Sequence, residues 1–137
     1  MQNHEEPMRE ISLLSQSKET DRKLRWSATV DDGTEFELYI PKEQVPDPWP
    51  RRIYVEIWGP EDNPLPRPAD RISNDAPIVE HVRFDRNHTR TARYTPLGDN
   101  KTWQLGQPYI PFVLLSDPPP RDLILRVRWD GSSTWRG

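Results

Sequence analysis

An alternating stretch around Asp31-Asp32-Gly33 constrains the fold of this chain more than any other feature. From Lys23 to Ile40, apolar and polar residues alternate on both sides of this tripeptide, which is the pattern of two half-buried β-strands. A three-residue loop places all the apolar side chains on one face, with Trp26 opposite Leu38, whereas a two-residue turn would split that face. The pattern therefore predicts a hairpin with the longer loop, in which Gly33 takes the left-handed conformation of a G1 bulge.

Several more short segments have the character of strands. Residues 52–58 and 122–129 alternate cleanly, and residues 78–86 and 88–95 alternate less cleanly. Residues 108–116 are almost continuously apolar, which predicts a strand buried on both sides, with a bulge or a sheet edge at Pro111. Together these segments predict an all-β fold, namely an antiparallel β-sandwich or a small partly open barrel of about seven or eight strands. No internal repeat is recognised.

The N-terminal residues 1–22 are predicted to form a tail that is either flexible or a short helix, and residues 23–137 to form a single β-domain. Glu5-Glu6-Pro7 is typical of a helix start, and Met8, Ile11 and Leu14 follow at helical spacing. The chain is also rich in proline, with 16 prolines against 6 glycines. The longest proline-rich loop is predicted over residues 60–77, and loops of that length in a compact domain are often functional.

Composition excludes some classes of chemistry and disfavours others. The chain of 137 residues contains no cysteine, so it has neither disulfides nor thiolate metal ligands. Its net charge of −3 gives no general attraction to nucleic acids or anionic membranes. No apolar run approaches a membrane span, and no signal peptide is visible, so a cytoplasmic location is expected. Residues 1–66 carry 8 Lys/Arg against 14 Asp/Glu and residues 67–137 carry 11 against 8, an asymmetry that could orient a partner.

Only one cluster has the residue types of a metal or catalytic site. His81, Asp85 and His88 lie close together in the sequence, but His81 and Asp85 would be roughly 13 Å apart along an extended strand. A hairpin turn at 85–87 is the simpler interpretation, so the three residues are only weak metal candidates, and no cofactor is predicted. No nucleophile motif of the Gly-x-Ser-x-Gly kind is present, which favours a non-enzymatic protein.

A set of arginine and aromatic residues is predicted to point outward from the strands. These residue types are enriched in protein interfaces, because they bury a large area and keep a polar group. One alternative is that loops or the N-terminal segment cover the aromatic rings. Another is that the rings form a sugar-binding platform. Nucleic-acid binding is disfavoured because glutamates are interspersed among the arginines. The candidate binding residues are Arg25, Tyr39, Arg52, Tyr54, Trp58, Arg126 and Arg128.

The favoured function is therefore a protein–protein interaction module, or an accessory or regulatory subunit of a larger complex. It would bind another protein, or a second copy of itself, through the aromatic–arginine sheet face or through the loop 60–77; addition of an exposed strand edge to a partner's sheet is a further possibility. The alternative is a small-ligand-binding or carbohydrate-binding domain, or a metal-dependent hydrolytic domain, centred on His81, Asp85 and His88.

Overall fold

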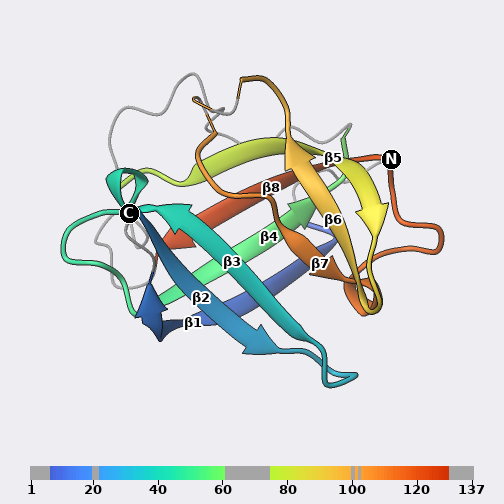
Figure 1. The fold of residues 1–137 in the computed structure, drawn as a ribbon, viewed down its shortest axis with the longest axis horizontal. Helices are drawn as coiled ribbons and strands as arrows, with labels where there is room; N and C mark the ends of the chain where they lie inside the picture. Colours follow the sequence, from blue (N-terminus) through green and yellow to red (C-terminus); the bar gives the residue numbers. More distant parts are fainter. Residues whose placement is uncertain (1–6, 20–21, 61–74, 100, 102, 130–137) are drawn as a thin grey trace.

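The computed structural model describes residues 7–19, 22–60, 75–99, 101 and 103–129, with the backbone alone over 16–19. They form eight antiparallel strands in one closed barrel, whose order is β1-β2-β3-β7-β6-β5-β8-β4 (Figure 1). The described residues also include the short 3-10 turns η1 (Lys42–Gln44) and η4 (Phe112–Leu114). The strands are β1 (Arg9–Glu19), β2 (Lys23–Thr29), β3 (Glu35–Pro41), β4 (Arg52–Trp58), β5 (Ile78–Asn87), β6 (Thr91–Pro96), β7 (Tyr109–Pro111) and β8 (Asp122–Trp129).

The prediction of an antiparallel all-β fold is confirmed, and it is the barrel form that the chain adopts. The barrel closes because β1 pairs with β2 on one side and with β4 on the other. The predicted N-terminal helix is therefore wrong. Ile11 and Leu13, two residues apart, face the core, whereas Met8 and Leu14 of the presumed helical face are exposed. Closing the sheet satisfies backbone groups that an open edge would leave unpaired, and this outweighs a weak helical spacing.

The hairpin between β2 and β3 has the predicted register. Trp26 lies opposite Leu38, and Ala28 lies opposite Phe36. The backbone N–H of Val30 donates to Thr34 O at 2.9 Å, and Gly33 has φ of 86°. A side chain at Gly33 would be strained at that angle, because L-residues rarely adopt it.

The apolar segment 108–116 does not form the long buried strand that its composition suggested. Strand β7 covers only three residues, and η4 follows directly after Pro111. Val113 is one of the exposed large apolar side chains. The loop predicted over residues 60–77 lies mostly outside the described residues. No helix in the described part of the chain is long and apolar enough to cross a membrane.

Large apolar side chains fill the barrel interior. Inward positions on β4 and β8 are buried as predicted, and those on β2, β3 and β6 join them in one cluster. The largest fully buried side chains are Trp26, Trp129, Tyr94 and Phe36. The fold therefore has a packed core of the kind that small eight-stranded barrels build from their inward residues.

The structure shows an approximate internal repeat that the sequence analysis missed. Strands β4-β1-β2-β3 are neighbours in that order, and strands β8-β5-β6-β7 are neighbours in the same order. Residues 39–58 and 109–128 correspond at an offset of 70, with Tyr-Ile-Pro, Asp-Pro and Pro-Arg recurring at matching positions. Both β3 and β7 run directly into a 3-10 turn. We call residues 9–58 the N-half and residues 78–129 the C-half.

A pair of hydrogen bonds from the core supports this correspondence. Trp26 Nε1 donates to the carbonyl oxygen of Pro50 at 3.1 Å, and the hydroxyl of Tyr94 donates to that of Pro120 at 2.6 Å. Trp26 and Tyr94 occupy matching positions on β2 and β6, since Ser15 pairs with Trp26 as Phe84 pairs with Tyr94. Each half therefore uses a buried aromatic donor to fix the connection that leads into its last strand.

Candidate interaction faces at the two seams of the barrel

The two halves of the barrel meet at two seams, and the candidate residues lie on the outer faces of both. At the first seam β4 pairs with β8 through six residue pairs, from Ile53↔Trp129 to Trp58↔Ile124. At the second seam β3 pairs with β7 through Glu37↔Tyr109 alone. We call the outer surfaces of these pairings the β4–β8 face and the β3–β7 face. The seven predicted binding residues are divided between them.

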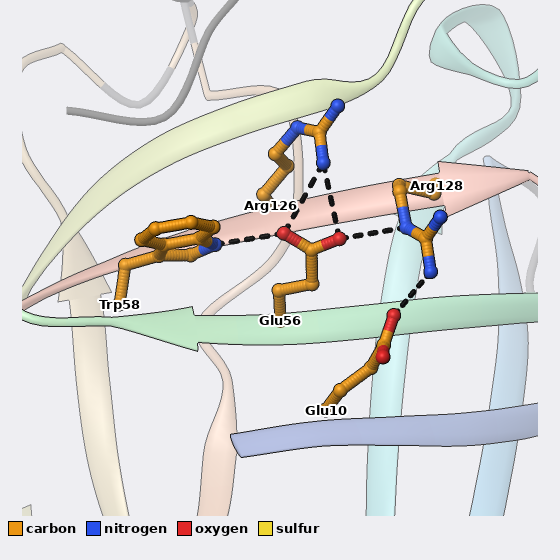
Figure 2. A network of polar contacts seen from close by, with 5 residues as sticks. All are labelled: Glu10, Glu56, Trp58, Arg126 and Arg128. Atoms are coloured by element: carbon orange, nitrogen blue, oxygen red, sulfur yellow. Dashed lines mark hydrogen bonds and ion pairs between the residues drawn. The ribbon is translucent and has the colours of Figure 1, made fainter. Parts of the chain in front are cut away.

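A buried carboxylate organises the β4–β8 face. Glu56 points outward on β4, yet it is only 4% exposed. Its carboxylate accepts hydrogen bonds from Arg126 Nη1 at 3.0 and 3.2 Å and from Trp58 Nε1 at 2.8 Å (Figure 2). Arg128 Nε lies 2.7 Å from the same carboxylate. Burial of this charge is compatible with folding because charged and polar donors surround it.

The arginines of this face are held in place from several sides. Arg128 also pairs with Glu10 of β1, and its guanidinium lies 5.3 Å from the centre of the Tyr54 ring. Arg52 Nη1 donates to the hydroxyl of Ser12 at 2.6 Å. Arg126 and Arg128 keep about a quarter of their side-chain surface exposed. Five of the predicted residues, namely Arg52, Tyr54, Trp58, Arg126 and Arg128, thus lie on one face.

Trp58 differs from the prediction in one respect. Strand parity places it on the outside of the barrel as predicted, but it is buried, with 6% of its surface exposed. Its indole N–H donates a hydrogen bond to the carboxylate of Glu56. Alternation assigns a side chain to a face of the sheet, whereas the exposure of that side chain depends on the neighbours that cover it. Trp58 therefore contributes a hydrogen bond to Glu56 and offers little exposed surface to a partner.

The other two predicted residues lie on the β3–β7 face. Arg25 is opposite Tyr39 on β2 and β3, as predicted. Its guanidinium pairs closely with Glu37, and Glu35 lies 3.5 Å away. The same arrangement recurs on β6 and β7, where Arg93 is opposite Tyr109. A hydrogen bond with Tyr109 and a second with Asp85 raise the pKa of the Arg93 guanidinium.

Sequence reasoning did not single out Arg93 and Tyr109. Tyr109 is 38% exposed and contacts His88, with the two ring centres 5.1 Å apart. The repeat of Tyr-Ile-Pro at residues 39–41 and 109–111 was the signal that could have identified them. The β3–β7 face therefore carries two matching Arg–Tyr pairs, one from each half.

The three weak metal candidates do not come together. His81 Nε2 lies 3.5 Å from Asp122, whose pKa is lowered mainly by its hydrogen bond with Arg83. Asp85 pairs with Arg93 on the neighbouring strand. Within the described ranges, no group of three His, Asp or Glu side chains has an arrangement that could hold a metal ion.

One further carboxylate is unusual because it faces the barrel interior. Glu80 of β5 lies opposite Leu125 of β8 and is 7% exposed. Its position in the C-half matches that of Ile11 in the N-half. Burial raises its pKa to about 7. Glu80 Oε1 accepts the backbone N–H of Gln104 at 3.0 Å, and the backbone N–H of Gly106 donates to Tyr39 O at 2.9 Å. Residues 103–107, which we call the strap, thus connect β5 to β3.

Comparison with known proteins does not assign this chain. No protein-family model matches it, and no curated protein is significantly similar to it.

Proposed function

We propose that this protein is a non-enzymatic protein-interaction module that binds another protein through the β4–β8 face. The observation that carries the proposal is the fixed position of the partly exposed Arg126 and Arg128, which converge on the buried Glu56 (Figure 2). Binding costs less conformational entropy when the contacting side chains are already immobilised. Arginine, tyrosine and tryptophan are also the residues that most often dominate binding energy.

Charge and shape support the same proposal. The arginines are balanced by Glu10 and Glu56 at short range, so the face is not a general phosphate-binding surface. Side chains fill the barrel interior, so the proposal places recognition on the outside of the barrel. The metal-dependent alternative receives less support, because within the described ranges no group of three His, Asp or Glu side chains could hold a metal ion. A cytoplasmic location stays a prediction.

A capture experiment with matched variants tests the proposal. The full chain is immobilised, native host lysate is passed over it, and retained proteins are quantified by mass spectrometry for the wild type, Tyr54→Ala and Arg128→Ala. We expect one partner to be lost with both variants, and its purified form to bind each about 10-fold or more weakly by calorimetry, because truncating a hot-spot residue costs about 1–2 kcal/mol or more.

Arg83→Ala is the matched control for this experiment. Arg83 is also an outward arginine paired with a carboxylate, Asp122, but it lies on β5 away from the β4–β8 pairing. The partner should be retained by Arg83→Ala at wild-type level. Retention of every captured protein by both the Tyr54 and the Arg128 variants, with melting temperatures unchanged, would refute the proposal.

A further inference from the structure

The register of the β4–β8 seam is symmetric with respect to the internal repeat. Val55 pairs with Val127, and Ile57 pairs with Leu125. At the offset of 70, Ile57 corresponds to Val127 and Val55 corresponds to Leu125. Exchanging the two halves therefore turns each of these pairs into the other. The centre of this approximate twofold symmetry is the pair Glu56↔Arg126.

Glu56 and Arg126 are thus equivalent positions that carry opposite charges. If two N-halves paired in the same register, Glu56 would lie opposite Glu56; if two C-halves paired, Arg126 would lie opposite Arg126. Like charges directly opposite each other on neighbouring strands are destabilising. In the observed pairing Arg126 donates to both oxygens of the Glu56 carboxylate, at 3.2 and 3.0 Å.

The charge distribution of the chain follows the same division. Acidic residues are in excess over residues 1–66, and basic residues are in excess over residues 67–137. In the structure, Glu10 and Glu56 of the N-half pair with Arg126 and Arg128 of the C-half (Figure 2). These four charged residues therefore pair across the seam, each with a residue of the other half.

We propose that the barrel is a fused dimer of two related half-barrels, and that Glu56 and Arg126 at the internal twofold axis ensure that unlike halves pair. Each half then carries an interaction surface that pairs with the other half and is repelled by a copy of the same half. Two copies of the chain can associate through this surface only by exchanging complementary halves. This is specificity by repulsion of the wrong pairing as well as attraction of the right one.

The test starts from the full chain with a specific protease site introduced between Gly59 and Ile78. The folded protein is cleaved there, unfolded in denaturant and refolded, and the complexes of N-terminal and C-terminal fragments are identified by native mass spectrometry. We expect the wild type to re-form the unlike complex, with like complexes at least roughly 100-fold rarer, because each like complex places two equal charges opposite each other at the centre of the seam. Glu56→Gln should allow pairs of N-terminal fragments to appear.

Glu10→Gln is the matched control, since Glu10 belongs to the same cluster but lies on β1, away from the β4–β8 pairing. It should leave the unlike complex as the product. Like pairs in the wild type, or only unlike pairs with Glu56→Gln, would overturn the role of these charges. Failure of the wild-type fragments to reassociate would overturn the description of each half as a pairing unit.

A second set of variants guards against a general loss of folding. Arg126→Glu should strongly reduce reassociation of the cleaved chain, because Glu56 would then face another carboxylate. Combining it with Glu56→Arg restores opposite charges on the axis and should recover part of the unlike complex, limited by Arg128 beside the new arginine. If the double variant reassociates no better than Arg126→Glu alone, the proposal is wrong.

Discussion

The two seams join the same two halves in very different ways. The β4–β8 seam has six residue pairs and a cluster of opposite charges around the buried Glu56. The β3–β7 seam has one paired residue, and Pro108 stands where the matching Leu38 of the other half continues its strand. Pro108 O accepts the backbone N–H of Tyr94 at 2.9 Å, so the backbone of Pro108 faces β6, and its missing N–H shortens the ladder between β6 and β7. The repeat thus preserves the position of the strands but not the strength of their pairing.

The weaker seam is reinforced by a segment that has no counterpart in the N-half. A tight turn joins β2 to β3, whereas residues 97–108 join β6 to β7. Within them, Gln104 donates to Glu80 and Gly106 donates to Tyr39 O. Leu105, between these two residues, is fully buried. The strap therefore holds together a part of the barrel in which the strand ladder is short. Substitutions at three carboxylates test the contrast between the seams.

Removing the carboxylate of Glu56 should have the largest effect. Glu56→Ala leaves Arg126 and Arg128 without their shared acceptor and leaves Trp58 Nε1 unpaired. Breaking a buried ion pair by deleting one partner costs roughly 3–5 kcal/mol. We expect the free energy of unfolding, measured by urea denaturation at pH 7, to fall by about that amount.

The choice of substitution separates charge from packing at this site. Glu56→Gln keeps an oxygen acceptor for the indole N–H of Trp58, so its free energy of unfolding should fall by less than that of Glu56→Ala. If Glu56→Ala changes the free energy of unfolding by less than about 1 kcal/mol, as is usual for an exposed pair, then the β4–β8 seam is not held by this cluster.

Glu80 should give the next largest effect, and one that depends on pH. Its pKa rises from the ordinary value of 4.5 to about 7 in the folded protein, so folding favours the protonated form. The associated stability is fully present below about pH 4.5, is lost as the pH rises to about 7, and stays lost above. A raised pKa of this size corresponds to roughly 3 kcal/mol. Glu80→Gln removes this dependence and should therefore be more stable than the wild type by about that amount at pH 8.

Comparing the wild type with Glu80→Gln from pH 4 to pH 8 isolates this carboxylate from all others. The two proteins should have similar stability near pH 4.5 and diverge as the pH rises. Amide hydrogen exchange at Gln104 and Gly106, corrected for its intrinsic pH dependence, should accelerate in the wild type over the same interval. Parallel stability curves for the two proteins would mean that Glu80 does not titrate while the strap is in place.

Local features of the fold could be predicted from the sequence. The register of the 23–40 hairpin followed from the two-residue period and from Gly33, and both were found as expected. The inward faces of β4 and β8 followed from the same alternation. These features depend on residues close together in the chain, so a pattern of a few residues determines them.

Features that depend on distant pairing could not be predicted in the same way. The pairing of Glu56 with Arg126 joins residues 70 positions apart, and the identity of β1 depends on strands on both sides of it. The repeat was missed because its identical residues are few. The offset between matching positions also changes, from 70 at Tyr39 and Tyr109 to 68 at Trp26 and Tyr94. Both Arg–Tyr pairs are visible as residues, but only the barrel shows that they share one face.

The smallest effect is expected for Glu37, the carboxylate at the β3–β7 seam. Glu37 lies opposite Tyr109 and pairs with Arg25, but about a third of its side chain is exposed. After Glu37→Ala, Glu35 is still 3.5 Å from the same guanidinium, so Arg25 keeps a partner. Exposed ion pairs contribute roughly 0–1 kcal/mol, and the loss in urea denaturation should stay within that range. A loss of stability as large as that of Glu56→Ala would show that both seams depend equally on charge. Removing one carboxylate would then cost as much at the seam with one residue pair as at the seam with six.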